Sequence, residues 1–112
     1  MPNLPTLPTD RRIDRSKIEE YLLHPINGRG KAAFFEAHGF SLARWEGLRD
    51  ALLEHAASGR LSEAVVSPYG TRYIVRGGLR TPDARDPQPV VCSVWQADDG
   101  AVGLRLITAY PN

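Results

Sequence analysis

The sequence predicts an α+β fold in which about three N-terminal helices pack on a four-stranded antiparallel meander sheet. Up to about residue 60, apolar residues recur at three- and four-residue spacing, which is typical of helices with one buried face. After Arg60 the period changes to that of strands, and short turn sequences separate the segments. Such short turns favour antiparallel neighbours. At 112 residues the chain has the size of one domain with a single modest core.

Residues 1–12 are predicted to form a flexible N-terminal arm, and residues 13–112 the single α+β domain. Three prolines between positions 2 and 8 disfavour a helix around each of them. Leucines 4 and 7 offer the arm little apolar surface. We therefore expect the first nine residues to be dispensable for folding.

The three helices are expected over residues 16–23, 29–38 and 41–57. Ser16 and Glu19 have the spacing of a capping box, which would open the first helix. Gly39 is expected to end the second in a left-handed conformation. The third helix carries an apolar stripe at helical spacing, formed by Leu42, Trp45, Leu48, Leu52 and Ala56.

The four strands are expected over residues 61–67, 72–79, 90–97 and 102–110. In the third strand, alternation places Cys92 and Val94 on one face and Ser93 and Trp95 on the other. In the fourth, Leu104, Leu106, Thr108 and Tyr110 are expected to share a face. The helices should cover one side of this sheet, with a common core that includes Phe34, Trp45, Leu48, Leu52, Val94 and Leu106.

Composition narrows the function classes. The formal charge of +1, from 14 basic and 13 acidic side chains, argues against a broad nonspecific nucleic-acid surface but leaves room for a small basic cleft. The single cysteine, Cys92, cannot form an internal disulfide, and three scattered histidines make a structural zinc site improbable. No apolar run approaches the length of a membrane span. These features predict a protein that acts in the cytoplasm without a cofactor, although a domain excised from a larger exported chain would have the same features.

Candidate catalytic residues lie near the front of the chain. His24 ends the first predicted helix, and two interpretations are open: a general acid or base, or a helix-terminal histidine that bonds to carbonyls. Lys31 follows Gly28-Arg29-Gly30 at the start of a helix, where backbone amides and cations can hold an anion. The other interpretation of Lys31 is a solvated surface lysine.

Further candidates lie in the strands. Thr108 and Tyr110 place hydroxyl groups at the end of an apolar strand face. Such a strand end either borders a cleft or emerges into open solvent. Arg76 and Arg80 lie in or beside a strand and could contact phosphates, or they could be charges that protect the sheet from aggregation. Trp95 could stack on a nucleobase or belong to the core.

A combination of motifs covers nearly the whole chain after Arg15. Its members are Tyr21-Leu22-Leu23, His24-Pro25, Gly30-Lys31-Ala32, Phe34-Phe35, Pro68-Tyr69-Gly70, Tyr73 with Val75, Gly78-Leu79 with Pro82, Val94-Trp95, and Leu106 to Pro111. This pattern resembles an uncharacterised bacterial family known only as a domain of unknown function. More distantly, helices followed by a four-stranded sheet, with His and Lys in front and a Thr-x-Tyr-Pro ending, are similar to ribonuclease toxins of the barnase, EndoU, colicin and RelE type.

The second resemblance implies a metal-independent endoribonuclease that acts as the toxin of a toxin–antitoxin or polymorphic toxin system. By the same resemblance His24 would be the acid or base, Lys31 the phosphate contact, and Thr108 and Tyr110 polar groups at the strand end. The implied partners are RNA, either tRNA or mRNA, and a neutralising antitoxin or immunity protein. The alternative is a non-catalytic interaction module, such as an antitoxin, an immunity protein or a phage accessory protein, in which the same motifs serve the fold.

Overall fold

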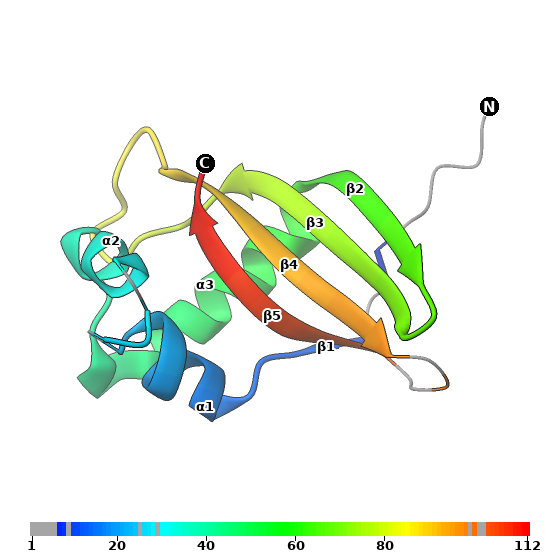
Figure 1. Cartoon of the computed structure of the whole chain (residues 1–112). Coiled ribbons are helices and arrows are strands. Elements are labelled where there is room, and N and C mark those ends of the chain that lie inside the picture. Colours follow the sequence, from blue (N-terminus) through cyan, green and yellow to red (C-terminus); the bar gives the residue numbers. More distant parts are fainter. Residues whose placement is uncertain (1–6, 9, 25, 29, 99, 101–102) are drawn as a thin grey trace.

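The computed structural model describes residues 7–8, 10–24, 26–28, 30–98, 100 and 103–112 (Figure 1). The helices lie against one face of a sheet with the strand order β1-β5-β4-β3-β2. The α+β class and the order of helices before the main strands are therefore confirmed. None of the helices in these ranges is long and apolar enough to cross a membrane.

The helical half follows the predicted positions with changes in geometry. Helix α1 (Arg15–Lys17) runs directly into a π-helical turn, η1 (Ile18–Leu22). Helix α2 spans Lys31–Ala37, and a 3₁₀ turn, η2 (Leu42–Arg44), leads into α3 (Trp45–Ser58).

The predicted capping box is wrong. Ser16 lies inside α1, and Asp14 occupies the N-cap position without a side-chain cap. Glu19 instead forms an ion pair with Arg15, one turn earlier on the helical surface. Gly39, in contrast, ends α2 as expected, with φ of +96°, and the Phe40 amide donates back to the Phe35 carbonyl at 3.1 Å.

The sheet is mixed and has five strands, which corrects the prediction of four antiparallel strands. Strands β2 (Arg60–Ser67), β3 (Gly70–Gly78), β4 (Val90–Asp98) and β5 (Leu104–Pro111) form the expected antiparallel meander. The additional strand, β1 (Arg11–Arg12), lies within the predicted arm and pairs in parallel with β5. Two residues are too few to show an alternating pattern, so periodicity could not predict this strand.

The core lies between the helices and the inner face of the sheet. Leu48, Leu52 and Leu106 belong to it as predicted, and Phe34 and Trp45 pack against it while partly buried. The strand residues deepest in the core include Val75, Val91, Trp95, Leu104 and Ala109. Val94 is also buried, but its strand neighbours place it on the outer face of the sheet, so its predicted place in this core is wrong.

A β-bulge in β5 changes which residues share a face. Leu106 lies opposite Trp95, but Thr108 lies opposite Val94, so Ile107 is an extra residue in the ladder. The extra residue shifts the alternation: Ala109 is buried on the inner face, while Thr108 and Tyr110 move to the outer one. The prediction that Thr108 and Tyr110 continue the Leu104 and Leu106 face is therefore wrong.

Candidate functional site

Two hydroxyl groups from opposite ends of the chain meet at the edge of β5. Tyr21 of η1 and Thr108 of β5 are 87 positions apart, and their hydroxyl oxygens lie 3.2 Å from each other. Strand β1 pairs with Leu104 and Arg105 of β5, and α1 and α2 contact the same strand. Figure 1 shows these helices beside β5. The contact therefore joins the helical half to the sheet.

Two lysines flank the Tyr21 ring. The Nζ of Lys17 lies 5.1 Å from the ring centroid and the Nζ of Lys31 lies 5.5 Å from it. Both distances are within the range of a cation–π contact. The Thr108 hydroxyl, and then the two lysine charges, lower the pKa of Tyr21, although partial burial acts in the opposite direction. We call Lys17, Tyr21, Lys31 and Thr108 the hydroxyl–lysine cluster.

A glycine turn positions Lys31 at the first residue of α2. The Gly28 amide donates to the His24 carbonyl at 2.9 Å, and a Cβ at Gly28 would lie 2.7 Å from both the His24 and the Tyr21 carbonyl oxygens. Gly30 caps α2 with φ of +88°, which a residue with a side chain adopts only with strain. These two positions require glycine, and they hold Lys31 beside the turn that carries Tyr21.

His24 lies directly after η1, on the same turn. Its amide donates to the Tyr21 carbonyl at 3.1 Å. Its Nδ1 accepts from the Ile26 amide at 3.2 Å and from the Asn27 amide at 3.0 Å. The ring thus caps a turn through amides, whereas the structural interpretation from the sequence invoked carbonyls. Because Nδ1 is occupied, any proton transfer by His24 would use Nε2.

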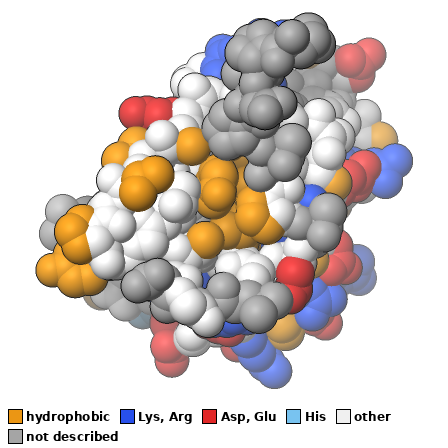
Figure 2. Space-filling model, turned by 90° about the vertical axis from the view of Figure 1, so that its right-hand side faces the viewer, with side chains coloured by type: hydrophobic (Ala, Val, Ile, Leu, Met, Phe, Trp, Pro, Cys, Tyr) orange, Lys and Arg blue, Asp and Glu red, His pale blue; other side chains and the backbone are white. Residues whose placement is uncertain are grey.

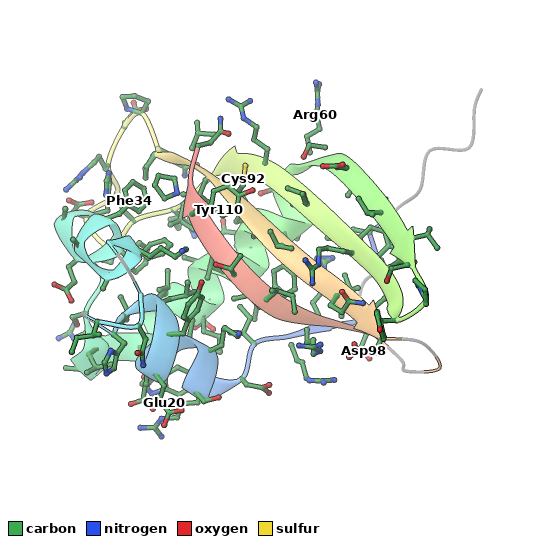
Figure 3. All side chains as sticks on the ribbon, in the orientation of Figure 1. Glu20, Phe34, Arg60, Cys92, Asp98 and Tyr110 are labelled. Carbon is green, nitrogen blue, oxygen red and sulfur yellow. The ribbon has the colours of Figure 1, made fainter. Side chains whose placement is uncertain are left out.

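Tyr110 lies on the outer face of the sheet, beside Cys92 of β4 (Figure 3). Burial, together with Cys92 and the carboxylate of Glu63, raises the pKa of Tyr110. Arg76 of β3 lies opposite Cys92 on the same face. The structure records no bond from Tyr110 to the hydroxyl–lysine cluster within the described residues, so it brings together Lys31 and Thr108 but does not link Tyr110 to them.

The remaining candidates lie apart from this cluster. Arg80 follows β3 and forms an exposed ion pair with Glu54 of α3 at 3.5 Å. Trp95 is completely buried, and its Nε1 donates to the Ser93 hydroxyl at 2.8 Å. A nucleobase cannot stack on it in this conformation, so its predicted role as a stacking platform is corrected to core packing. Arg29 lies outside the described residues.

Two residues of the cluster, Tyr21 and Lys17, were not among the candidates predicted from the sequence. Tyr21 packs against the core from η1, as is typical of the apolar face of a helix. A tyrosine on such a face nevertheless brings a hydroxyl that needs a polar partner. Lys17 precedes Tyr21 by one helical turn, the spacing at which two side chains meet. This spacing of Lys17 and Tyr21 was the feature of the sequence that could have indicated the cluster. Within the described residues, no group of three or more His, Cys, Asp or Glu side chains is arranged to hold a metal.

Comparison with known families identifies the domain. The family described as Domain of unknown function (DUF6883) matches residues 4–112. The chain belongs to this family. The first of the two resemblances seen in the sequence is thereby confirmed, and membership of the DUF6883 family by itself assigns no activity.

One solved structure with the same fold is a chain of a "Contact-dependent growth inhibition toxin - immunity protein complex from Klebsiella pneumoniae 342". The TM-score is 0.67 at 18% sequence identity, and the match covers 89% of this DUF6883 chain and 92% of the other chain. At this identity the comparison shows a shared fold. No curated protein matches the chain significantly.

Proposed function

We propose that this domain is a metal-independent endoribonuclease that acts as the toxin of a toxin–immunity or toxin–antitoxin system. The observation that carries the proposal is the hydroxyl–lysine cluster: the paired hydroxyls of Tyr21 and Thr108, with the Nζ atoms of Lys17 and Lys31 beside the Tyr21 ring. Such a group of donors and cations suits a phosphodiester that gains negative charge as it reacts.

The reaction uses a nucleophile that RNA itself provides. The 2′-oxygen attacks the adjacent phosphorus, the bond from phosphorus to the 5′-oxygen breaks, and a 2′,3′-cyclic phosphate forms. One proton leaves the 2′-hydroxyl and one is added to the departing 5′-oxygen, so no other reactant is required. The protein has to move these protons and stabilise the additional charge on the phosphate.

The residues near the cluster match these tasks. Lys31 and Lys17 balance the charge on the phosphate, and the Tyr21 hydroxyl donates a hydrogen bond to one of its oxygens. A phenol with a lowered pKa is a stronger donor to a developing anion. The Thr108 hydroxyl orients Tyr21. His24, which follows Tyr21 by less than one turn, transfers the proton through Nε2.

The shared fold supports a place in a toxin system. The similar solved chain comes from a complex of a growth inhibition toxin with its immunity protein, as its title states. By analogy, this domain would act on RNA, either tRNA or mRNA, in the cytoplasm of a target cell. A neutralising protein would then cover the cluster.

Cleavage of RNA in the presence of EDTA is the direct test. The purified domain should cut single-stranded RNA and leave a 2′,3′-cyclic phosphate or its hydrolysis product, while DNA of the same sequence stays intact because it lacks the attacking hydroxyl. Lys31→Ala should remove most of this activity. Arg44→Ala is the control: Arg44 is a cation in the exposed 3₁₀ turn η2 and is not a member of the cluster, so this variant should retain the RNA cleavage activity.

Expression in bacteria separates the proposal from the non-catalytic alternative. A toxin should slow growth, and Lys31→Ala should relieve this effect. An immunity protein shares such complexes with toxins, so the fold comparison is compatible with that role too. Normal growth together with intact RNA in both assays would contradict the ribonuclease proposal and favour the interaction module.

A further inference from the structure

A hollow of about 270 Å³ lies on the outer face of the sheet, apart from the hydroxyl–lysine cluster. It is lined by side chains from three consecutive strands and the turn between two of them, namely Val65, Ser67, Tyr69, Arg72 and Gln96. The volume is slightly below the range of about 300–1,000 Å³ that is usual for small-molecule pockets. The hollow therefore suits a planar fragment rather than a folded chain.

Gln96 places a buried amide in this hollow. The residue is only 6% exposed. Its Nε2 donates to the Ala97 carbonyl at 3.3 Å, and no described side chain donates to its Oε1. Gln96 Oε1 is not one of the fully buried polar atoms that lack a partner in the described residues, so this oxygen remains accessible to a group that enters the hollow. The amide can accept and donate at the edge of a nucleobase.

Tyr69 provides an aromatic surface at the rim of the hollow. It lies in the β2–β3 turn and is 81% exposed. The Ser67 hydroxyl fixes the turn: it accepts from the Tyr69 amide at 3.2 Å and donates to the Gly70 carbonyl at 3.2 Å. Figure 2 views the side of the molecule on which this turn lies and shows hydrophobic side chains gathered at the surface. An exposed aromatic ring on a fixed turn is suited to stacking on a base.

Arg72 adds a positive charge beside these groups. It is exposed, and within the described part of the chain it forms no ion pair. It lies opposite Gln96 in the β3–β4 ladder, so its guanidinium and the amide share one face. The Tyr69 ring can stack on the face of a base, the Gln96 amide can bond to its edge, and the Arg72 guanidinium can contact the neighbouring phosphate.

The hollow lies on the same face of the sheet as Thr108. Thr108 is opposite Val94, and Val94 precedes Gln96 by two residues on β4. Two residues of a strand span roughly 7 Å. Gln96, on the side of the hollow nearest to β5, is therefore about two strand residues from the partner of Thr108, and we infer that a single strand of RNA follows this face from the cluster to the hollow.

From this geometry we propose that Tyr69, Arg72 and Gln96 form a nucleobase subsite, which gives the domain a sequence preference next to the cleaved bond. The proposal rests on the proposed ribonuclease function and specifies its substrate: single-stranded RNA with one unstacked base held between Tyr69 and Gln96. Arg72 then contacts a phosphate, which contributes affinity but no base preference.

Binding of RNA that cannot be cut tests the subsite separately from cleavage. Short 2′-O-methyl homopolymers of A, C and U lack the attacking hydroxyl, and their dissociation constants follow from fluorescence anisotropy. Tyr69→Ala should weaken binding by about 5- to 100-fold, the effect of losing one stacked base. Tyr69→Phe keeps the ring and should bind like the unchanged domain. Val66→Ala is the matched control, because Val66 lies in the same hairpin and is 80% exposed.

Gln96→Leu should reduce the difference in affinity between the three homopolymers. Arg72→Ala should weaken all three by a similar factor and reduce the salt dependence of binding. Thermal melts establish that each variant is folded; Arg72 and Tyr69 are exposed, so their variants keep the test informative if Gln96→Leu does not fold.

The outcomes distinguish the two proposals. Binding that depends on Tyr69, without cleavage of natural RNA, would keep the subsite and contradict the ribonuclease. If the Tyr69→Ala variant binds and cuts RNA as well as the Val66→Ala control does, the subsite proposal is contradicted and the ribonuclease proposal stands. Absence of any binding by the unchanged domain would overturn the subsite.

Discussion

Tyr21 of η1 and Tyr110 of β5 have opposite electrostatic surroundings. The Thr108 hydroxyl and two lysines lower the pKa of Tyr21, whereas burial, Cys92 and Glu63 raise that of Tyr110. The residue nearer to positive charge should ionise first. This contrast gives Tyr21, the tyrosine of the hydroxyl–lysine cluster, a measurable property that does not depend on the substrate.

In an alkaline titration followed by tyrosinate absorbance, Tyr21 should ionise below the ordinary tyrosine pKa of about 10 and Tyr110 above it. Tyr21→Phe should remove the earliest part of the absorbance change. Thr108→Val should move that part to higher pH, because the hydroxyl that stabilises the phenolate is lost. An early component that survives in Tyr21→Phe would show that the cluster does not have the described electrostatics.

Removal of the Tyr21 hydroxyl should also slow RNA cleavage. Tyr21→Phe keeps the ring against the lysines and the core, so the loss isolates the hydrogen bond. We expect a fall in kcat of about 10²–10³, as for other lost donors to a developing oxyanion. Tyr73→Phe is the matched control, since Tyr73 also packs partly buried against the core. Equal rates for both variants would exclude a role for the Tyr21 hydroxyl.

Substitution of His24 distinguishes its two interpretations. His24→Ala should lower the cleavage rate by about 10²–10⁴ if the ring transfers a proton. The lost bonds to the Ile26 and Asn27 amides should in addition cost about 0.5–1.5 kcal/mol each in unfolding free energy. His24→Asn, whose side-chain oxygen can accept from the same amides, should recover the stability but not the rate. A recovery of both would assign His24 to the turn alone.

Among the elements, the interface of α3 with β3 contains a buried histidine. His55 is 1% exposed, its Nδ1 lies 3.3 Å from the Gly78 carbonyl, and its Nε2 has no hydrogen-bond partner. Gly59 and Gly77 allow this close approach: a Cβ at Gly77 would lie 3.1 Å from the Cα of Gly59. This close packing disfavours the charged form of the ring.

Burial lowers the pKa of His55 below its unfolded value of about 6.5. His55 therefore binds a proton more readily in the unfolded chain than in the folded one. The free energy of unfolding should fall as the pH drops below about 6.5. Urea melts over this range should show a smaller fall for His55→Met, which cannot be protonated, than for the unchanged domain. His38→Asn is the control. An identical pH dependence in His55→Met would mean that the ring has room to be charged in the fold.

The elements also show how far the sequence predicts this structure. Periodicity located the three helices and the four long strands, because each has enough residues to reveal its buried face. It could not reveal the bulge at Ile107, since Leu104, Leu106, Thr108 and Tyr110 alternate without interruption and only pairing with β4 fixes the face. The site depends on tertiary structure in the same way. Lys31 and Thr108 were candidates because of their local motifs, whereas Tyr21 joins the site only through a partner 87 positions away.

At the scale of the whole molecule, residues 10–12 join the start of the chain to the sheet. Arg11 and Arg12 pair with β5, the Leu104 amide donates to the Asp10 carbonyl at 2.7 Å, and Leu7 packs against the core. Deletion of residues 1–6 should therefore leave the thermal midpoint nearly unchanged, whereas deletion of residues 1–12 should lower it. Equal midpoints after both deletions would show that β1 contributes nothing to stability.

The long reach of the Tyr21–Thr108 contact has a consequence for synthesis on the ribosome. The proposed cluster draws its tyrosine from the first helical segment and its threonine from the last strand, so it cannot assemble until β5 has left the exit tunnel and paired with β4. A nascent chain that carries all the lysines and Tyr21 would still lack the group that holds the phenol in place. If the proposed ribonuclease function is correct, a cell that makes this domain would meet its activity only after translation has passed Thr108, and a neutralising partner would have to be present by that moment.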